Sequence, residues 1–304
     1  MSATLTPAPT ATLLYFDDEA VPARRLAEAL GLPALAIAAH RFPDEELRLR
    51  LPFAAACPET LVLYRSLDRP NDKLVELLLV ARHARRQGTR RLILVAPYLA
   101  YMRQDIAFHP GEVVSQTLVG AFLAELVDAL ITVDPHLHRI ARLDQAVPLV
   151  DAIALSAAPA LGELAAARRP GALLLGPDEE AEQWVARAAA ASGLDHGVCR
   201  KQRHGDRQVT IALPELALAG RAVVLMDDVA SSGHTLARAA EALRGAGVAS
   251  VDVAVTHALF AGEALAVIEA AGIGELWSSD AIAHPSNALH LAPLLAEALE
   301  PLIR

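Results

Sequence analysis

One short stretch of the sequence places acids, hydroxyls and a glycine side by side. In residues 223–236, VVLMDDVASSGHTL, an apolar run ends in two aspartates and continues with small and polar residues. Backbone amides and hydroxyls at such a turn can surround a phosphate, and a glycine lets the backbone approach it. The carboxylates can accept hydrogen bonds from sugar hydroxyls or hold Mg²⁺. The pattern alone is equally consistent with a ribose-phosphate site and with an ordinary capped strand-to-helix turn, which uses the same residue types.

Alternating strands and helices would position this turn. Short apolar runs typical of strands buried on both faces stand at residues 60–64, 91–96, 129–133, 172–176, 222–226 and 251–259. Helical patterns that close on glycine occupy residues 72–88, 179–193 and 235–247, and a last apolar helical pattern occupies 289–299. This alternation predicts parallel sheets flanked by helices, with ligands bound at the carboxyl ends of the strands.

The length of 304 residues favours two domains, because it exceeds what one hydrophobic core usually fills. We expect an α/β protein with two successive domains, each a mostly parallel sheet flanked by helices. The predicted domains are residues 1–147 and 148–304, joined by the proline-containing stretch 143–159.

The composition excludes several classes of partner. A net charge of −9 argues against a general nucleic-acid or acidic-membrane surface, because both need a basic footprint. No apolar run reaches the length of a membrane span, and the first residues lack a signal-peptide pattern, so we expect a cytoplasmic protein. Cys57 and Cys199 stand far apart and outside any zinc spacing, which indicates free thiols.

The stretch at residues 223–236 resembles the ribose-phosphate loop of the phosphoribosyltransferase superfamily. The segment YMRQDIAFHPGE resembles a region of the ribose-phosphate pyrophosphokinases, or PRPP synthetases, that simple transferases lack. HRFPDEELRLRL, TVDPHLH, GPDEEA, RKQRHGDRQVTI and SSDAIAHPSN are similar to further motifs of that family, in its order. The likeness covers most of the chain and is greatest to the shorter, archaeal-type branch.

The resemblance implies a reaction and a set of site residues. The reaction transfers the diphosphoryl group of MgATP to the 1-hydroxyl of ribose 5-phosphate, giving PRPP and AMP, in two phosphoribosyltransferase-like domains. The residues that match the family's motifs are Lys201 and Arg203 for catalysis; Phe42, Asp44, Glu46, Arg103, Gln104 and Asp105 for ATP; Asp227, Asp228, Ser231, Ser232, Gly233, His234 and Thr235 for ribose 5-phosphate; and His136 and Asp178 for Mg²⁺.

The chain departs from the family pattern at three glycine positions. Glu45, Glu179 or Glu180, and His234 occupy them. Three interpretations stay open from the sequence: an active PRPP synthetase, a non-catalytic homologue that binds nucleotides or ribose phosphates as a regulatory subunit, and a phosphoribosyltransferase. The family further implies that the last helix returns to the first domain. It also implies a homo-oligomer, either a dimer or a hexamer.

Overall fold

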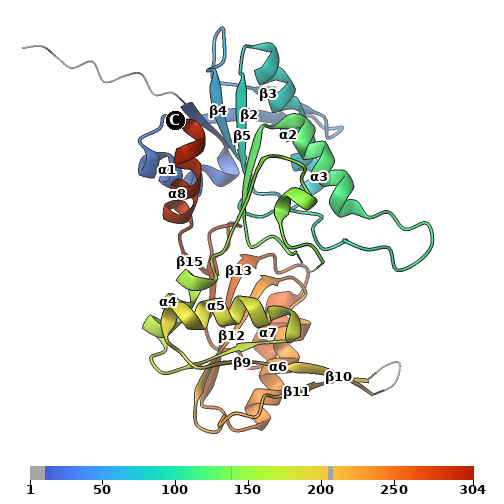
Figure 1. The fold of residues 1–304 in the computed structure, drawn as a ribbon, viewed down its shortest axis with the longest axis vertical. Coiled ribbons are helices and arrows are strands. Elements are labelled where there is room, and N and C mark those ends of the chain that lie inside the picture. The colour runs from blue at the N-terminus through green and yellow to red at the C-terminus, as the bar shows by residue number, and fades with distance from the viewer. Residues whose placement is uncertain (1–10, 138, 205–207) are drawn as a thin grey trace, which may run out of the picture. The chain divides into compact units, whose positions relative to one another are not determined.

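A computed structural model describes residues 11–137, 139–204 and 208–304, without the side chains of residues 201–210. The chain divides into two compact units (Figure 1). The first unit runs to Leu155 and includes Leu291–Arg304, and the second unit is Ser156–His290. The alternation of strand and helix patterns predicted this α/β architecture of two sheets flanked by helices, and the structure confirms it.

The first unit is built on a seven-stranded sheet in the order β3-β2-β1-β4-β5-β6-β7. All neighbouring strands are parallel except β2 and β3, which form an antiparallel edge. Its strands are β1 (Ala11–Phe16), β2 (Ala34–Arg41), β3 (Leu47–Arg50), β4 (Thr60–Tyr64), β5 (Arg91–Val95), β6 (Ala129–Val133) and β7 (Asp151–Leu155).

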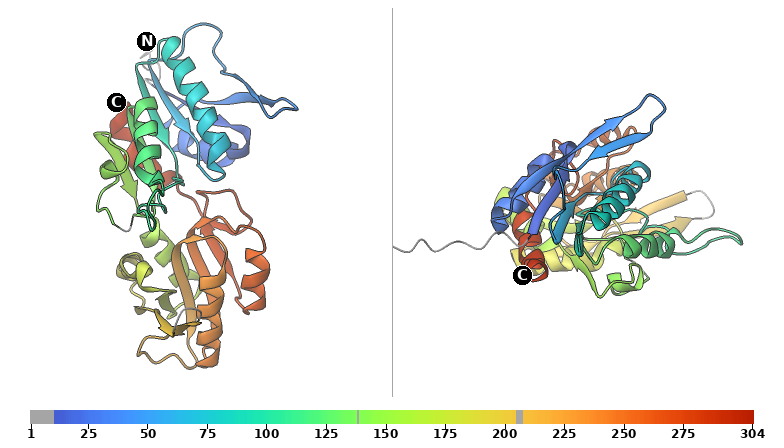
Figure 2. Two further views of the ribbon diagram at one scale, coloured as in Figure 1. Left: turned by 90° about the vertical axis from the view of Figure 1, so that its right-hand side faces the viewer. Right: turned by 90° about the horizontal axis from the view of Figure 1, so that it is seen from above.

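Helices cover both faces of this sheet (Figure 2). They are α1 (Ala20–Leu30), α2 (Pro70–Arg86), α3 (Ser115–Leu126) and α8 (Ala292–Ile303). The central strands β4, TLVLY, and β5, RLILV, are buried almost throughout because helices lie on both faces. Leucine, valine and alanine side chains from the sheet, α2 and α3 form the core of this unit.

The second unit is built on a six-stranded parallel sheet in the order β15-β14-β13-β12-β8-β9. Its strands are β8 (Leu173–Gly176), β9 (His196–Val198), β12 (Ala222–Ala230), β13 (Ser250–Ala258), β14 (Leu276–Ser279) and β15 (Asn287–Leu289), and its helices are α4 (Ala158–Arg168), α5 (Glu182–Ser192), α6 (His234–Gly245) and α7 (Ala264–Ala270). A separate antiparallel pair consists of β10 (Arg200–His204) and β11 (Gln208–Ala212).

The boundary between the units differs from the sequence expectation of residue 147. β7 follows that position and pairs with β6, from Ala129 with Asp151 to Val133 with Leu155, so the chain leaves the first sheet only after residue 155. Helix α8 contacts α1, β6 and β7, which places the end of the chain with the first unit.

None of the helices in the described ranges combines the length and apolarity that crossing a membrane requires.

Candidate active site

The turn between β12 and α6 contains the acids and hydroxyls that first suggested a ribose-phosphate site. We expected the strand to end at Met226 and the helix to begin at Thr235. The structure instead continues β12 to Ala230, because the strand stays paired with β13 as far as Ala230 with Ala258, and begins α6 at His234. Asp227 and Asp228 therefore lie within the last part of a strand.

Gly233 is required by the shape of this turn. Its φ angle is 76°, in the left-handed region that favours glycine. A Cβ atom at this position would lie 3.0 Å from the carbonyl oxygen of Ala264, which is tighter than an ordinary contact. Within the described residues no side chain caps the amino end of α6, so its first backbone N–H groups can bind an anion. Ser231 and Thr235 are half-buried beside them, and Ser232 is exposed.

The carboxyl ends of β8 and β12 bring three acids together, because these strands are neighbours in the sheet. Burial raises the pKa of Asp227 well above its usual value, and the charges of Asp228 and Asp178 raise it further. Asp178 is buried, and its carboxylate accepts a hydrogen bond from the backbone N–H of Glu180 at 3.1 Å. The site therefore concentrates negative charge that a cation would relieve.

Metal ligands were expected at His136 and Asp178. Across the described ranges, no group of three or more His, Cys, Asp or Glu side chains is close enough to hold a metal ion. Mg²⁺ commonly takes one or two carboxylates and completes its shell with water and substrate phosphates. Asp178, Asp227 and Asp228 fit that kind of incomplete site.

Both glutamates of the GPDEEA loop are exposed. Glu179 and Glu180 lie in a short 3-10 helix, η3 (Glu179–Ala181), so neither residue needs the left-handed conformation that glycine would supply. The carboxylate of Glu179 forms an ion pair with Arg200, with 3.5 Å between oxygen and nitrogen. At these positions a glutamate is accommodated without backbone strain.

The catalytic residues expected from the family, Lys201 and Arg203, lie on β10. The backbone pairs Lys201 with Ile211 and Arg203 with Val209. The described backbone forms a two-stranded ladder on either side of residues 205–207. The side chains of Lys201 and Arg203 lie outside the described part of the structure.

In the first unit, the turn between β2 and β3 holds the first group of expected ATP residues. Phe42 keeps 38% of its surface exposed, and the ring of His40 meets it edge-on at 4.8 Å between centroids. The carboxylate of Asp44 accepts a hydrogen bond from the backbone N–H of Glu46 at 3.3 Å. Glu45 has a φ angle of 72°, which explains why the family pattern has glycine there.

The segment between β5 and α3 holds the second group of expected ATP residues. Arg103 is exposed. The side-chain oxygen of Gln104 accepts a hydrogen bond from the N–H of Ser115 at 3.0 Å, and its amide nitrogen donates one to the carbonyl of Ile106 at 2.9 Å. The side chain of Gln104 thus organises this segment and the amino end of α3.

Asp105 is held by a residue that the sequence analysis missed. One guanidinium nitrogen of Arg139, Nη1, donates to both carboxylate oxygens, at 2.8 and 3.0 Å. Arg139 follows β6 in the chain, as do the half-buried His136 and the buried Asp134, whose φ angle is 38°. No sequence spacing links residues 105 and 139, so the pair is visible only in the fold.

Backbone strain gathers at the carboxyl ends of the strands. Among the described residues that are not glycine, positive φ angles occur after β4 at Arg69, after β5 at Tyr101, after β6 at Asp134, after β13 at Phe260, and in the hairpin at Glu45. Such conformations concentrate at functional sites. Their distribution supports the carboxyl edges as the functional edges of both sheets.

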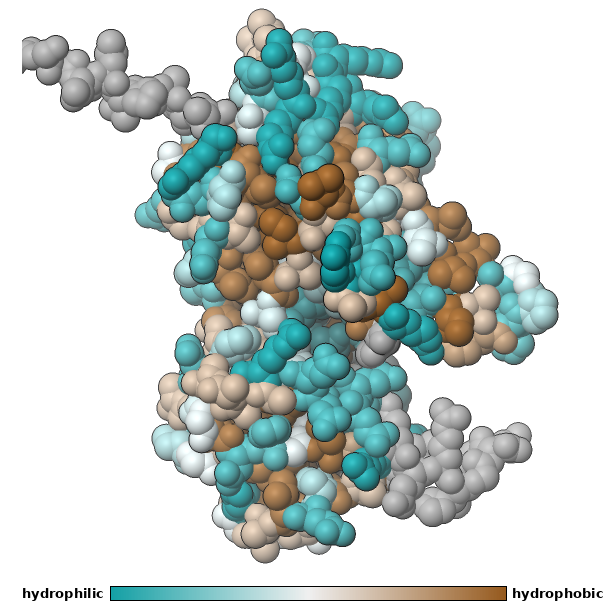
Figure 3. All heavy atoms as spheres, viewed as in Figure 1, coloured by the Kyte–Doolittle hydropathy of each residue, from teal (hydrophilic) through white to brown (hydrophobic). Residues whose placement is uncertain are grey.

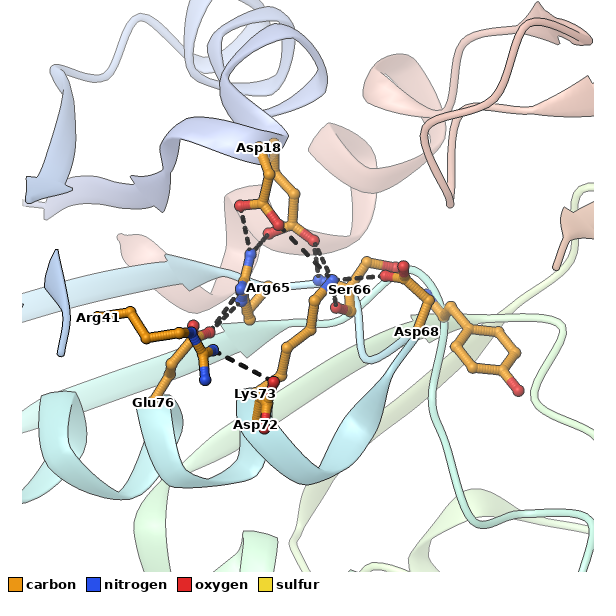
Figure 4. Close-up of polar contacts among 10 residues, drawn as sticks. Asp18, Arg41, Arg65, Ser66, Asp68, Asp72, Lys73 and Glu76 are labelled. Atoms are coloured by element: carbon orange, nitrogen blue, oxygen red, sulfur yellow. Dashed lines mark hydrogen bonds and ion pairs between the residues drawn. The ribbon is translucent and has the colours of Figure 1, made fainter. Parts of the chain in front are cut away.

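A buried ion cluster, also missed by the sequence analysis, lies where β1 and β4 end (Figure 4). Arg65 contacts Glu76 at 2.5 Å, Asp18 at 2.6 Å and Glu19 at 3.2 Å. Lys73 contacts Glu19 at 3.4 Å, and its ammonium donates to the carbonyl of Ser66 at 2.8 Å. The signal in the sequence was the run Asp17–Glu19, which directly follows the apolar residues of β1.

Glu19 is the most perturbed acid of this cluster. Its Oε1 accepts a hydrogen bond from the N–H of Ser66 at 2.8 Å, while Oε2 is paired with Arg65 but accepts no well-aligned hydrogen bond within the described residues. Burial raises the pKa of Glu19 to about 7, and Arg65 and Lys73 oppose that rise. Asp68 also lies 2.5 Å from Lys73, so the cluster holds four carboxylates and only two cations. This excess of negative charge favours binding of a proton.

Comparison with known proteins gives a consistent result. Residues 13–126 match the N-terminal domain of ribose phosphate pyrophosphokinase, and residues 149–267 match the phosphoribosyl transferase domain. A ribose-phosphate pyrophosphokinase of Methanopyrus kandleri is 37% identical over 285 residues, covering 92% of this chain and 95% of that protein. One of Methanosarcina acetivorans is 32% identical over 281 residues, covering 92% and 96%.

The crystal structure of a phosphoribosylpyrophosphate synthetase from Mycobacterium smegmatis has a TM-score of 0.81 to this chain at 20% identity, covering 96% of this chain and 98% of that one. That likeness shows the shared two-domain fold. The family resemblance read from RQD, DPH and the ribose-phosphate turn is confirmed by the relatives and the matched domains. The chain therefore belongs to the ribose-phosphate pyrophosphokinase family of enzymes.

Proposed function

We propose that this enzyme transfers the diphosphoryl group of ATP to the 1-hydroxyl of ribose 5-phosphate, giving PRPP and AMP. The hydroxyl oxygen attacks the β-phosphorus, the bond from that phosphorus to the α,β-bridging oxygen breaks, and the hydroxyl proton is released. The observation that carries the proposal is the turn from β12 to α6, which combines uncapped helix N–H groups, hydroxyls and paired acids.

The ribose 5-phosphate site is the β12 to α6 turn. The N–H groups at the start of α6, including that of His234, and the hydroxyls of Ser231, Ser232 and Thr235 receive the 5-phosphate. Asp227 and Asp228 stand at the other end of the turn and accept hydrogen bonds from the ribose hydroxyls. Phosphate and acids are thus separated along one ligand, which avoids repulsion between like charges.

The nucleotide site uses the two groups in the first unit. The exposed face of Phe42 stacks on the adenine, and Asp44 and Glu46 accept hydrogen bonds from the nucleotide. The segment with Arg103, Gln104 and Asp105 forms the other wall. Arg103 is exposed and suited to a phosphate oxygen, because a guanidinium binds phosphate as a fork.

Mg²⁺, bound with ATP, would be held in the second unit by Asp178 and would supply charge neutralisation on the transferred phosphates. A metal contact of His136 in the first unit stays a separate prediction. Positioning and electrostatic stabilisation provide most of the catalysis in phosphoryl transfer. Lys201 and Arg203 are the cations that we assign to the charge developing on the diphosphoryl oxygens. Arg203 would bind as a planar fork and Lys201 as a point charge.

The exposed apolar side chains support a homo-oligomer. The segment before α3 and the outer side of α3 expose Phe108, Val113 and Leu118 by 74%, 61% and 60%. Figure 3 shows brown apolar atoms gathered on that segment. Clustered exposed apolar side chains mark interaction surfaces. We propose that a second copy covers them in a cytoplasmic dimer or hexamer, which light scattering after size-exclusion chromatography tests through the molar mass.

The function is tested by ³¹P NMR of the purified protein with ATP, Mg²⁺ and ribose 5-phosphate. Signals of AMP and of the new diphosphate of PRPP are the expected result. Thermal stabilisation by ATP or ribose 5-phosphate without product would instead indicate the non-catalytic homologue. Consumption of added PRPP with a nucleobase, without AMP formation from ATP, would indicate a phosphoribosyltransferase.

A further inference from the structure

Arg139 and Asp105 form an ion pair in which the carboxylate side chain is buried and the arginine side chain is half-exposed. The side chain of Asp105 is 6% exposed, whereas that of Arg139 is 51% exposed. A single nitrogen of Arg139 satisfies both carboxylate oxygens, at 2.8 and 3.0 Å. A buried carboxylate behind a half-exposed guanidinium is suited to orienting that guanidinium, and little of Asp105 remains open to a ligand.

The rest of the guanidinium remains available. Among contacts between described residues, Nε and Nη2 of Arg139 have no hydrogen-bond or ion-pair partner. An arginine that an acid already holds on one side loses less conformational entropy when it binds a ligand, because its planar guanidinium is already oriented. Its free N–H groups match the spacing of two phosphate oxygens. Since the net charge of the chain is −9, an anionic substrate depends on individually placed cations of this kind.

The location of the pair connects it to the nucleotide site. Asp105 is the last residue of the RQD segment that follows β5, and Arg139 lies beyond the carboxyl end of the neighbouring strand β6. The pair therefore joins the two loops at adjacent strand ends, where an α/β sheet binds its ligands.

We propose that Arg139 is a further nucleotide-binding residue that contacts a phosphate of ATP, and that Asp105 is its positioning residue. This inference rests on the proposed function and changes the part of Asp105 within it, from a residue of the site's wall to an anchor for Arg139.

The neighbouring Arg142 provides a matched control. It also follows β6 and pairs with an acid, donating from Nε to Asp144 at 3.1 Å. Its side chain is 76% exposed and that of Asp144 is 30% exposed, so this pair lacks the buried anchor. Arg142→Met removes the same charge and similar bulk from the same segment.

The experiment measures kcat, the KM for ATP and the KM for ribose 5-phosphate in Arg139→Met, Asp105→Asn, the double variant and Arg142→Met. We expect Arg139→Met to raise the KM for ATP by about tenfold to a hundredfold, the range for a lost charged hydrogen bond, without changing that for ribose 5-phosphate. Asp105→Asn is expected to raise the KM for ATP less, and to add nothing in the Arg139→Met background.

Two results would overturn the inference. A KM for ATP in Arg139→Met equal to that of Arg142→Met would remove Arg139 from the site. A full effect of Asp105→Asn in the Arg139→Met background, accompanied by a changed preference for ATP over GTP, would show that Asp105 contacts the base directly. If Arg139→Met fails to fold, Arg139→Gln, which retains a donor for Asp105, supports the same comparison. An inactive parent protein would refute the proposed function, and calorimetric ATP binding to the same variants would then decide the role of Arg139.

Discussion

Replacing Glu19 with glutamine tests whether burial or ion pairing has the larger effect on the pKa of Glu19 in the cluster at the ends of β1 and β4. The pKa of Glu19 is raised from 4.5 to about 7, with burial as the largest cause. The folded chain then binds the proton more tightly than the unfolded chain, so the parent protein loses stability as the pH rises from about 4.5 to about 7. Glu19→Gln has no such ionisation and does not share that loss.

The magnitude follows from the size of the shift. Each pKa unit corresponds to about 1.4 kcal/mol, so a rise from 4.5 to about 7 corresponds to roughly 3 kcal/mol. The free energy of unfolding of Glu19→Gln, minus that of the parent, should therefore increase by up to about 3 kcal/mol between pH 4.5 and pH 8. Arg65 and Lys73 keep other carboxylate partners in the variant, namely Glu76 and Asp68.

The chain offers separate reporters for its two units. All four tyrosines lie in the first unit, at Tyr15, Tyr64, Tyr98 and Tyr101, and both tryptophans lie in the second, at Trp184 and Trp277. Urea unfolding followed by NMR of isotope-labelled tyrosine and tryptophan side chains reports each unit by itself. The pH-dependent difference is expected in the tyrosine signals, and Glu28→Gln, an exposed change on α1, is the control.

The opposite slope would refute the reasoning. If the ion pairs with Arg65 and Lys73 outweighed burial, Glu19 would ionise more readily in the folded chain than in the unfolded chain. The advantage of Glu19→Gln over the parent would then shrink as the pH rises. A flat difference would mean that burial and ion pairing cancel and leave the pKa of Glu19 at its ordinary value, which would also refute the prediction.

Three further predictions concern the substrate sites. Gly233→Ala should raise the KM for ribose 5-phosphate, because a left-handed φ of 76° costs a residue with a Cβ about 1–2 kcal/mol; an unchanged KM would contradict this. Glu45→Gly should increase the free energy of unfolding, measured by urea titration, by less than about 1 kcal/mol. It relieves left-handed strain, but the flexibility of glycine and the loss of the exposed ion pair with Arg41 partly offset that gain. A clear decrease would show that the ion pair outweighs the strain. Lys201→Ala and Arg203→Ala should each lower kcat far more than they weaken ribose 5-phosphate binding measured by calorimetry, and variants with the parent's kcat would remove these residues from catalysis.

Apolar runs predicted the central strands because burial on both faces leaves a continuous signal. TLVLY at residues 60–64 and ALITV at 129–133 are strands with those bounds, and RLILV forms β5. The strand predicted at 222–226 extends further in the structure. The prediction ended it too early because aspartates are depleted in strands and usually indicate a loop. Here pairing with β13 keeps Asp227 and Asp228 in the sheet.

Edge strands and ion pairs were harder to predict. Strand β10, RKQRH, is polar throughout and resembles a loop until its backbone pairing with β11, QVTIA, is seen. The bond between Arg139 and Asp105 joins residues from two different loops, and no periodicity encodes such a contact. The motifs predicted which segments contribute to the candidate site. The residues that contact the side chains of those segments depend on tertiary structure and could not be predicted.

The two sheets have the same strand order once they are aligned on their central strands. The first reads β2-β1-β4-β5-β6-β7, and the second reads β9-β8-β12-β13-β14-β15, parallel in both cases. The loops after β1 and β4 therefore correspond to the loops after β8 and β12. In the second unit these loops carry the acids and hydroxyls of the ribose-phosphate turn.

In the first unit the same place is filled by the chain itself. Arg65 and Lys73, which would suit a phosphate, are buried and paired with Asp18, Glu19 and other carboxylates of the same unit. A phosphate would have to displace these carboxylates and leave Glu19 and Glu76 buried without their cations, which costs several kcal/mol. The two sheets share a topology, but these loops differ in content. The difference is consistent with the proposed placement of the sugar phosphate at the second sheet and of the nucleotide at the carboxyl edge of the first.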